Sequence, residues 1–255
     1  MHPYTSLAIK LATNGAEMAK KAFLEHNVTG EHKVDGSYLT KHDAEIEQYI
    51  RQEITNQFPD HSVHGKEMAD SDNQGQYTWL IDPIEGTTNF VSGISFFCTM
   101  IAIIQGNDVV SAVIHNPLSQ STIWAERNEG AFINARKLIA EKCESLNQVT
   151  LILDSGRNPQ KRQMAGAYLD KNCNLFRSYR HYGCLNSQAA FIASKQPLVT
   201  LVLGVKDYDI AALSLILSES GCHVFDLEGR PWQLDKVTDF IACSPGLEKQ
   251  LLGTL

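Results

Sequence analysis

The sequence predicts a layered fold of helices and β-sheets, in which an α+β half is followed by an α/β half, and three observations predict it. Helix-like apolar patterns occupy the start of the chain. Short β-rich runs punctuated by Gly, Asn and Pro then follow one another, which is typical of an antiparallel meander. In the last part of the chain strand-like and helix-like runs alternate, which indicates an α/β layer.

Two helices are expected before the first sheet. Over residues 6–26 apolar residues recur with helical spacing, and most of the lysines and glutamates lie off that stripe. A second helix is expected after Thr40, because helical apolar spacing continues over residues 46–58. Thr40 and Asp43 resemble the start of a capping box, and the helix should end near Pro59.

The rest of the chain is expected to form two sheets with their helices. The strands of the meander are expected within residues 78–83, 97–106, 108–117, 121–130 and 131–138. The later strands are expected within 149–156, 175–183, 198–204, 222–229 and 239–245, and the later helices within 158–170, 186–194, 209–220 and 246–253.

The composition indicates a soluble globular protein. The chain has 255 residues, 43% hydrophobic and 20% charged, which allows one large domain or two intimate ones. We expect an N-terminal part, residues 1–140, and a C-terminal part, residues 141–255. No apolar run is long enough to cross a membrane. The net charge is −7 and basic residues are scattered, which argues against nucleic acid as the main ligand.

The cysteines and the N-terminus favour a reducing, cytoplasmic location. The six cysteines are widely spaced without a C-x-x-C pair, so we expect reduced and mostly buried thiols rather than a zinc site or a disulfide scaffold. The N-terminal segment is too charged, and its apolar core too short, for a secretory signal.

The stretch 79–90, WLIDPIEGTTNF, contains the first candidate site. A strand is expected to end at Ile81, because Pro83 cannot donate to the ladder, and Asp82 and Glu85 then project from a turn. Two carboxylates with the carbonyl of Ile84 between them form an all-oxygen set, which suits Mg²⁺. The alternative is that Asp-Pro and Glu-Gly are only turn chemistry.

The residues that follow suit an anion. Gly86 lets the backbone approach a ligand closely, and the N–H groups of Gly86, Thr87 and Thr88 would face a phosphate. Two more acids are candidates with structural alternatives: Asp43 as the N3 acid of a capping box, and Asp209 as the N-cap of the helix beginning DIAAL.

These motifs together resemble those of the inositol monophosphatase family. The string W-x-x-D-P-x-x-G-T-T-N-F is similar to the family signature W-x-x-D-P-[I/L]-D-G-T-x-N-F, with Glu85 in place of its second aspartate. The resemblance continues in LTKHD (39–43), FPDHSVHGKE (58–67), NEGAFINARKL (128–138) and YDIAALSLILSESGC (208–222).

The resemblance implies an α-β-α-β-α sandwich with an antiparallel N-terminal sheet and a smaller C-terminal α/β sheet. It also implies a hydrolase, an inositol-1-monophosphatase-like, Mg²⁺-dependent phosphomonoesterase in which metal-activated water attacks a small phosphorylated metabolite. Family members use two or three Mg²⁺ ions and many are lithium-sensitive. The resemblance also suggests a homodimer.

The resemblance also assigns roles to residues. Asp43 and Thr87 would polarise the attacking water, and Lys33 matches a lysine on a mobile loop. The implied metal ligands are Glu67, Asp82, the Ile84 carbonyl, Glu85 and Asp209, with Asp82 bridging two ions, and the implied substrate-binding residues are Gly86, Thr87, Thr88 and Asp209.

Several positions depart from the family pattern. Lys66 replaces a glutamate that usually binds the first metal. Three outcomes are then open: Glu67 shifts in as the ligand, the Lys66 ammonium occupies part of that metal's place, or the site is lost. The alternative is that Lys66 points to solvent and matters little. Glu85 is one methylene longer than aspartate, and Ser37 replaces a common acid. Val202 stands where inositol-preferring members carry an acid, which weakens an inositol assignment.

Two hypotheses follow. The first is a Mg²⁺-dependent phosphatase of this family, with an inositol phosphate, another sugar phosphate, a nucleotide or histidinol phosphate as substrate. The second is a catalytically impaired relative that binds a phosphorylated ligand or a protein partner, as Lys66, Glu85 and Ser37 suggest.

Overall fold

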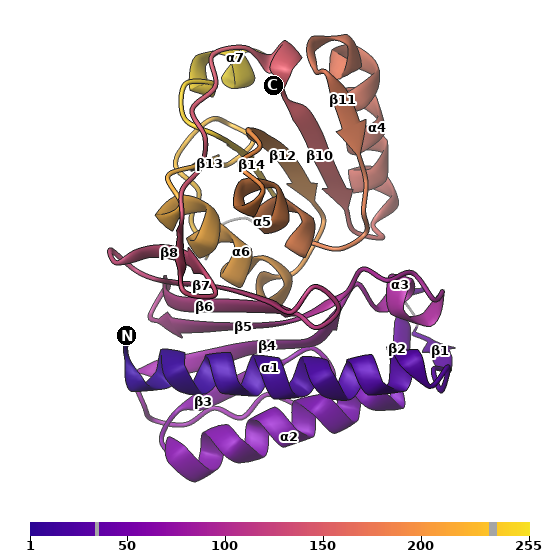
Figure 1. The fold of residues 1–255 in the computed structure, drawn as a ribbon, viewed down its shortest axis with the longest axis vertical. Coiled ribbons are helices and arrows are strands. Elements are labelled where there is room, and N and C mark those ends of the chain that lie inside the picture. Colours follow the sequence, from indigo (N-terminus) through magenta and orange to yellow (C-terminus); the bar gives the residue numbers. More distant parts are fainter. Residues whose placement is uncertain (34–35, 235–238) are drawn as a thin grey trace.

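Two β-sheets are layered between helices in the computed structural model, which describes residues 1–33, 36–234 and 239–255 (Figure 1). Helices α1 and α2 cover the outer face of the larger sheet, and α5 and α6 lie between it and the smaller sheet (Figure 1). Helix α4 covers the far side of the smaller sheet. This α-β-α-β-α order confirms the predicted layered fold.

The N-terminal part holds the seven-stranded sheet, in the order β3-β4-β5-β6-β7-β8-β9. β3 and β4 are parallel, and all later neighbours are antiparallel, so the predicted meander is confirmed. Its elements are α1 (Pro3–Leu24), β1 (Gly30–His32), β2 (Tyr38–Thr40), α2 (Lys41–Gln57), β3 (Ser62–Gly65), β4 (Tyr77–Glu85), α3 (Thr87–Val91), β5 (Cys98–Gln105), β6 (Asp108–Asn116), β7 (Ser121–Glu126), β8 (Gly130–Ile133) and β9 (Arg136–Leu138).

The C-terminal part holds a five-stranded mixed sheet, in the order β11-β10-β12-β14-β13. β10 is parallel to both of its neighbours, while β14 is antiparallel to β12 and β13. Its elements are η1 (Leu146–Gln148), β10 (Thr150–Ser155), α4 (Pro159–Asn172), η2 (Cys173–Leu175), β11 (Ser178–Arg180), α5 (Asn186–Ala193), β12 (Leu198–Leu203), α6 (Asp207–Glu219), β13 (His223–Phe225), β14 (Phe240–Cys243) and α7 (Glu248–Leu252).

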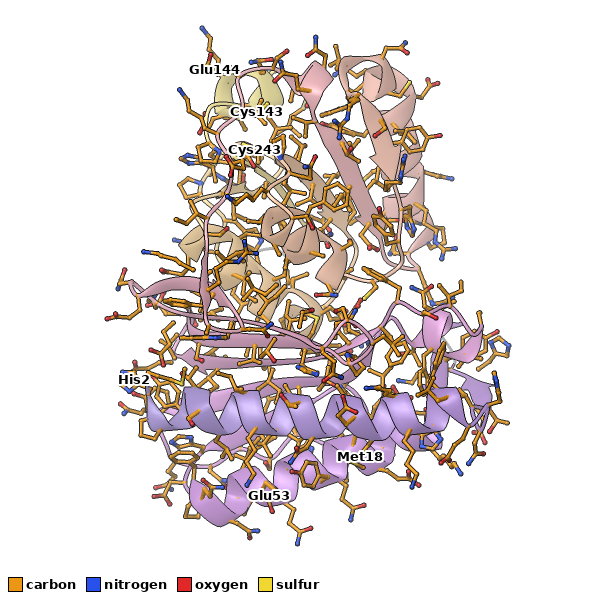
Figure 2. The ribbon with its side chains drawn as sticks, in the orientation of Figure 1. His2, Met18, Glu53, Cys143, Glu144 and Cys243 are labelled. Atoms are coloured by element: carbon orange, nitrogen blue, oxygen red, sulfur yellow. The ribbon has the colours of Figure 1, made fainter. Side chains whose placement is uncertain are left out.

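Hydrophobic clusters between the layers hold them together. One cluster joins α1 and α2 to the larger sheet, a second joins both sheets to α5 and α6, and a third joins the smaller sheet to α4 and α7. Helix α1 is amphipathic for this reason: Leu11 is fully buried, whereas Met18 is exposed on the outer face (Figure 2). The division at residue 140 stays a prediction.

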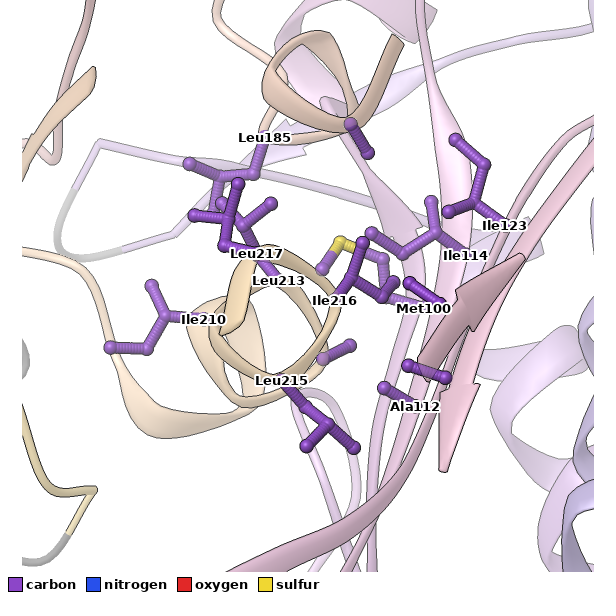
Figure 3. Close-up of a cluster of buried hydrophobic side chains, with 14 of the residues drawn as sticks. Met100, Ala112, Ile114, Ile123, Leu185, Ile210, Leu213, Leu215, Ile216 and Leu217 are labelled. Carbon is purple, nitrogen blue, oxygen red and sulfur yellow. The ribbon is translucent and has the colours of Figure 1, made fainter. Parts of the chain in front are cut away.

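Helix α6 is apolar around most of its circumference because it lies between two sheets. Leu213 and Ile216 are fully buried; Ile216 lies near Met100 and Ile114 of the larger sheet, whereas Leu213 lies on the side of Leu185 and Leu217 (Figure 3). A helix buried on all sides needs no polar face. Helix α6, which carries Asp209 in its first turn, also packs against β4 of the larger sheet.

The strand that carries the candidate acids runs further than predicted. We expected it to end at Ile81, whereas β4 continues to Glu85, so that prediction is wrong. The pairing register with β5 shifts between Asp82 and Glu85, as in a β-bulge, so Pro83 lies where the ladder is interrupted anyway. The Pro83 carbonyl accepts a hydrogen bond from the Thr99 hydroxyl at 2.7 Å.

The helix that carries Asp209 begins earlier than predicted. α6 starts at Asp207, so Asp209 is not the N-cap but the third helical residue. Its Oδ2 atom accepts a hydrogen bond from the Lys206 N–H at 3.0 Å, as the N3 acid of a capping box does. The N-terminal helices and the Thr40–Asp43 capping box are confirmed.

The cysteines are free thiols, and all but the half-buried Cys173 are buried, as predicted. Within the described residues no helix has the length and apolar character needed to span a membrane.

Candidate functional site

Two of the predicted metal ligands meet on the ammonium group of Lys66. Lys66 Nζ donates hydrogen bonds to Asp82 Oδ2 at 2.6 Å and to Asp209 Oδ1 at 3.1 Å. The Asp82 side chain is 0% exposed and that of Asp209 is 16% exposed. Burial acts to lower the pKa of Lys66, but the charges of Asp209 and Asp82 outweigh it and hold that pKa well above its ordinary value. The ammonium is therefore charged.

Glu85 lies in a more apolar setting beside two thiols. Its Oε2 atom accepts a hydrogen bond from the Leu185 N–H at 3.0 Å, and its carboxylate and the Cys98 and Cys184 sulfurs lie within 4.8 Å of one another. Burial raises the pKa of Glu85 to about 8, and the nearby Lys66 ammonium opposes the rise. Without a further cation this carboxyl group is mostly protonated at neutral pH.

The turn after β4 brings together the next predicted residues. Gly86 has a φ of 84°, which favours glycine, and a Cβ there would lie 3.1 Å from a backbone oxygen. The Thr87 hydroxyl donates to the Ile84 carbonyl at 2.7 Å. That carbonyl, which the resemblance implies as a metal ligand, therefore already accepts one hydrogen bond. Thr87 and Thr88 begin α3, so their N–H groups have no partner one helical turn earlier.

The loop after β3 carries Lys66 and Glu67 in a fixed position. The buried Glu47 carboxylate of α2 accepts hydrogen bonds from the N–H groups of Glu67 at 2.8 Å and Met68 at 3.1 Å. Gly65 makes this contact possible, because a Cβ there would lie 2.1 Å from Glu47 Oε1. Glu67 Oε2 pairs with the ammonium of Lys33. Glu67 thus lies beside Lys66 in sequence but has its own cationic partner.

Asp43 lies on α2 one helical turn before Glu47 and faces the same loop of Lys66 and Glu67. Its Oδ2 atom accepts hydrogen bonds from the Thr40 N–H at 2.8 Å and the Thr40 hydroxyl at 2.6 Å. Burial raises the pKa of Asp43 to about 6, although the bonds from Thr40 oppose the rise. Among the described residues no hydrogen bond joins Asp43 to Thr87, so their joint action on a water stays a prediction.

Three carboxylate oxygens of the candidate site have no hydrogen-bond partner in the part of the chain that the structure describes. Asp43 Oδ1, Glu67 Oε1 and Asp82 Oδ1 are buried and have no hydrogen-bond partner among the described residues. The second oxygen of each carboxylate is occupied by Thr40, Lys33 and Lys66 respectively. Oxygen-only ligands suit Mg²⁺. By contrast, the space between Asp82 Oδ2 and Asp209 Oδ1 already contains an ammonium group and does not fit a metal ion.

Sequence reasoning missed two charged residues on the α/β side of the site. Asp154, at the end of β10, pairs in register with Val202, and its buried Oδ2 atom has no hydrogen-bond partner among the described residues. Burial raises its pKa to about 6; the charge of His181 opposes the rise and the charge of Asp209 adds to it. Arg157 donates a hydrogen bond to the Thr88 hydroxyl oxygen at 2.7 Å. Only the parallel pairing of β10 with β12 brings Asp154 to this place.

The fold and this acid-rich site define a member of the inositol monophosphatase family, and the chain belongs to it: the family's sequence profile matches residues 1–255. The chain is 28% identical over 266 residues to the protein named Nus factor SuhB of Pseudomonas aeruginosa, covering 100% of this chain and 96% of the relative. It is 26% identical over 255 residues to the Fructose-1,6-bisphosphatase/inositol-1-monophosphatase of Aquifex aeolicus, covering 98% and 94%.

Solved structures show the same fold. The extragenic suppressor protein suhB from Bartonella henselae matches with a TM-score of 0.91 at 23% identity, covering 99% of this chain and 98% of that one. The relatives named as phosphatases support phosphatase chemistry for the family in general, and family members are metal-dependent, usually with Mg²⁺. Lithium sensitivity, a cytoplasmic location and a homodimer stay predictions.

Proposed function

We propose that the protein is a phosphomonoesterase that hydrolyses a small phosphorylated alcohol with the help of one Mg²⁺ ion. The observation that carries this proposal is the set of three buried carboxylate oxygens without partners, on Asp43, Glu67 and Asp82. Unpaired buried oxygens are costly, and a hard cation would satisfy them. Membership in a family with metal-dependent phosphatases supports the same conclusion.

Glu67 and Asp82 would hold the ion. Bound there, Mg²⁺ would neutralise charge on the phosphate and lower the pKa of a bound water. Glu85 and the Ile84 carbonyl, expected as ligands from the resemblance, would be second choices, because the buried carboxylate oxygens without partners among the described residues lie on Asp43, Glu67, Asp82 and Asp154 and not on Glu85, and the Ile84 carbonyl already accepts a hydrogen bond. Asp209 would act through Lys66 rather than on a metal.

Residues of the chain would bind and orient the phosphate. The first N–H groups of α3, at Thr87 and Thr88, and the close backbone at Gly86 favour an anion. Because the Thr87 hydroxyl donates its proton to a carbonyl, its oxygen is available to accept a hydrogen bond from the attacking water. Asp43 would receive a proton from that water, and Arg157 adds positive charge at Thr88.

Asp154 would recognise the alcohol part of the substrate. Its free Oδ2 atom accepts hydrogen bonds only, when ionised, so a hydroxyl group is its natural partner. Asp154 lies one strand away from Val202, where the resemblance leads one to expect an acid. A hydroxyl-bearing substrate is therefore compatible with this site despite Val202.

Phosphate release from a substrate panel tests the proposal. The panel contains an inositol monophosphate, fructose 1,6-bisphosphate, a nucleoside monophosphate, a nucleoside bisphosphate and histidinol phosphate, each with Mg²⁺ or with EDTA. We expect Mg²⁺-dependent release of phosphate that Asp82→Asn lowers at least about 100-fold, as for loss of a group that stabilises the transition state. Asp72→Asn is the matched control, because Asp72 is exposed and pairs with His64. Equal activity of Asp82→Asn and Asp72→Asn would contradict the proposal.

The bonds of Lys66 to two acids favour a second candidate, a protein that binds a phosphorylated ligand or a protein partner without appreciable turnover. Similarity to proteins named Nus factor SuhB supports this candidate as well. Turnover by the double variant Lys66→Glu with Glu85→Asp distinguishes the phosphatase from the binding protein. If the double variant raises Mg²⁺-dependent turnover by orders of magnitude over a nearly inactive wild type, the second candidate holds; brisk turnover by the wild type rejects it.

A further inference from the structure

The position of Lys66 is unusual for a lysine because both of its hydrogen-bonded partners belong to the candidate metal site. Its ammonium group lies 2.6 Å from one carboxylate oxygen on β4 and 3.1 Å from another on α6. Its side chain is only 21% exposed, and the Tyr208 ring lies 5.8 Å from Nζ, within the range of a cation–π contact. Lysine side chains that lack a structural role usually extend into water instead.

Hydrogen bonds hold the backbone around Lys66 in place, and this backbone position directs the side chain toward the two acids. The Lys66 N–H donates to the Ile81 carbonyl of β4 at 3.2 Å. The next two N–H groups bind the carboxylate of Glu47, which Arg51 also contacts at 2.8 Å. These bonds hold the loop against β4 and direct the side chain between Asp82 and Asp209.

The two carboxylate oxygens cannot hold the ammonium and a divalent ion at once. A Mg²⁺ ion bound to both oxygens would lie about 2.0–2.1 Å from each, which is the region that Nζ occupies. The two cations would also repel each other strongly at such a separation. A single charge on Lys66 offsets part of the negative charge of Asp82 and Asp209, which otherwise repel each other.

We propose that the ammonium of Lys66 is a built-in cation that replaces the divalent ion expected between Asp82 and Asp209. The protein then binds at most one divalent ion at this site, on the side of Glu67. The inference deepens the proposed function, with which it shares the site, but its test requires no turnover. It also differs from the alternatives that the family resemblance suggested for Lys66, which concerned the first metal and not the space between the ligands of the second.

Counting bound Mn²⁺ by electron paramagnetic resonance, with Mg²⁺ calorimetry as a second measurement, tests the proposal on the full chain. We expect wild type to bind no more than one ion per chain and Lys66→Glu to bind one ion more than wild type. Lys161→Gln is the matched control, because Lys161 pairs with Asp239 in the α/β part. It should bind the same number of ions as wild type.

Equal ion counts for folded Lys66→Glu and wild type would overturn the proposal, and so would two or more ions bound to wild type at this site. If Lys66→Glu does not fold, wild type alone decides: anomalous scattering from Mn²⁺ in crystals must show no ion between Asp82 and Asp209, and an ion there overturns the proposal. A wild type without phosphatase activity leaves these ion counts unaffected, so failure of the proposed function is distinguishable from failure of this inference.

Discussion

Replacement of Glu85 by glutamine should remove a pH dependence from the stability of the metal-free protein. Burial raises the pKa of Glu85 from 4.5 to about 8, so the folded protein keeps a proton that the unfolded chain releases. A raised folded-state pKa contributes stability that is present below the unfolded pKa and is lost as pH rises through the folded pKa. Wild type should therefore lose stability between about pH 4.5 and about pH 8 in EDTA.

The magnitude follows from the same interval. At about 1.4 kcal/mol per pH unit, Glu85 contributes a loss of about 5 kcal/mol in unfolding free energy across this range. For a chain of this length the loss corresponds to about 10–20 °C in Tm. Glu85→Gln carries no titrating group but can still accept the hydrogen bond from Leu185. The Tm of Glu85→Gln should match that of wild type near pH 5 and exceed it at pH 8.5.

Thermal unfolding in EDTA at intervals from pH 5 to pH 8.5 is the assay. Glu53→Gln is the control, since Glu53 projects from the outer face of α2 (Figure 2). Parallel Tm curves for wild type and Glu85→Gln across this range would refute the reasoning. A constant offset between the two curves would likewise show that Glu85 is ionised throughout.

Three further predictions concern the scaffold of the site and the core. Glu47→Ala should cost about 3–5 kcal/mol in unfolding free energy, because the N–H groups of Glu67 and Met68 lose their acceptor. Urea denaturation measures the loss, and a change below about 1 kcal/mol would contradict this prediction. Gly65→Ala should destabilise the protein by a similar amount, because its Cβ would lie 2.1 Å from Glu47 Oε1, and a normal urea midpoint would show that the loop adapts. Leu213→Ala should cost about 2–5 kcal/mol by leaving a cavity between the sheets, measured in the same way, while unchanged stability would mean that the core closes around it.

The predictions that held rest on local chemistry. The spacing of apolar residues predicted the strands and helices, because an element that buries one face carries apolar residues with its own period, about two residues in a strand and about 3.6 in a helix. The capping box at Thr40 and Asp43 was predictable for the same reason, since both partners lie within one turn. The end of the strand at Ile81 was wrong because a β-bulge let the ladder resume after Pro83, and bulges depend on the partner strand.

The sequence by itself determined the family, the layered fold and the residue types available to the site. It also identified Lys66 as a departure, but three outcomes for this residue were compatible with the sequence. Only the tertiary structure decided among contacts between distant segments: Lys66 reaches Asp209 across 143 positions of sequence, and Asp154 comes beside Val202 through strand pairing. The physical reason is that these contacts depend on how α6 and the two sheets pack, which apolar periodicity does not specify.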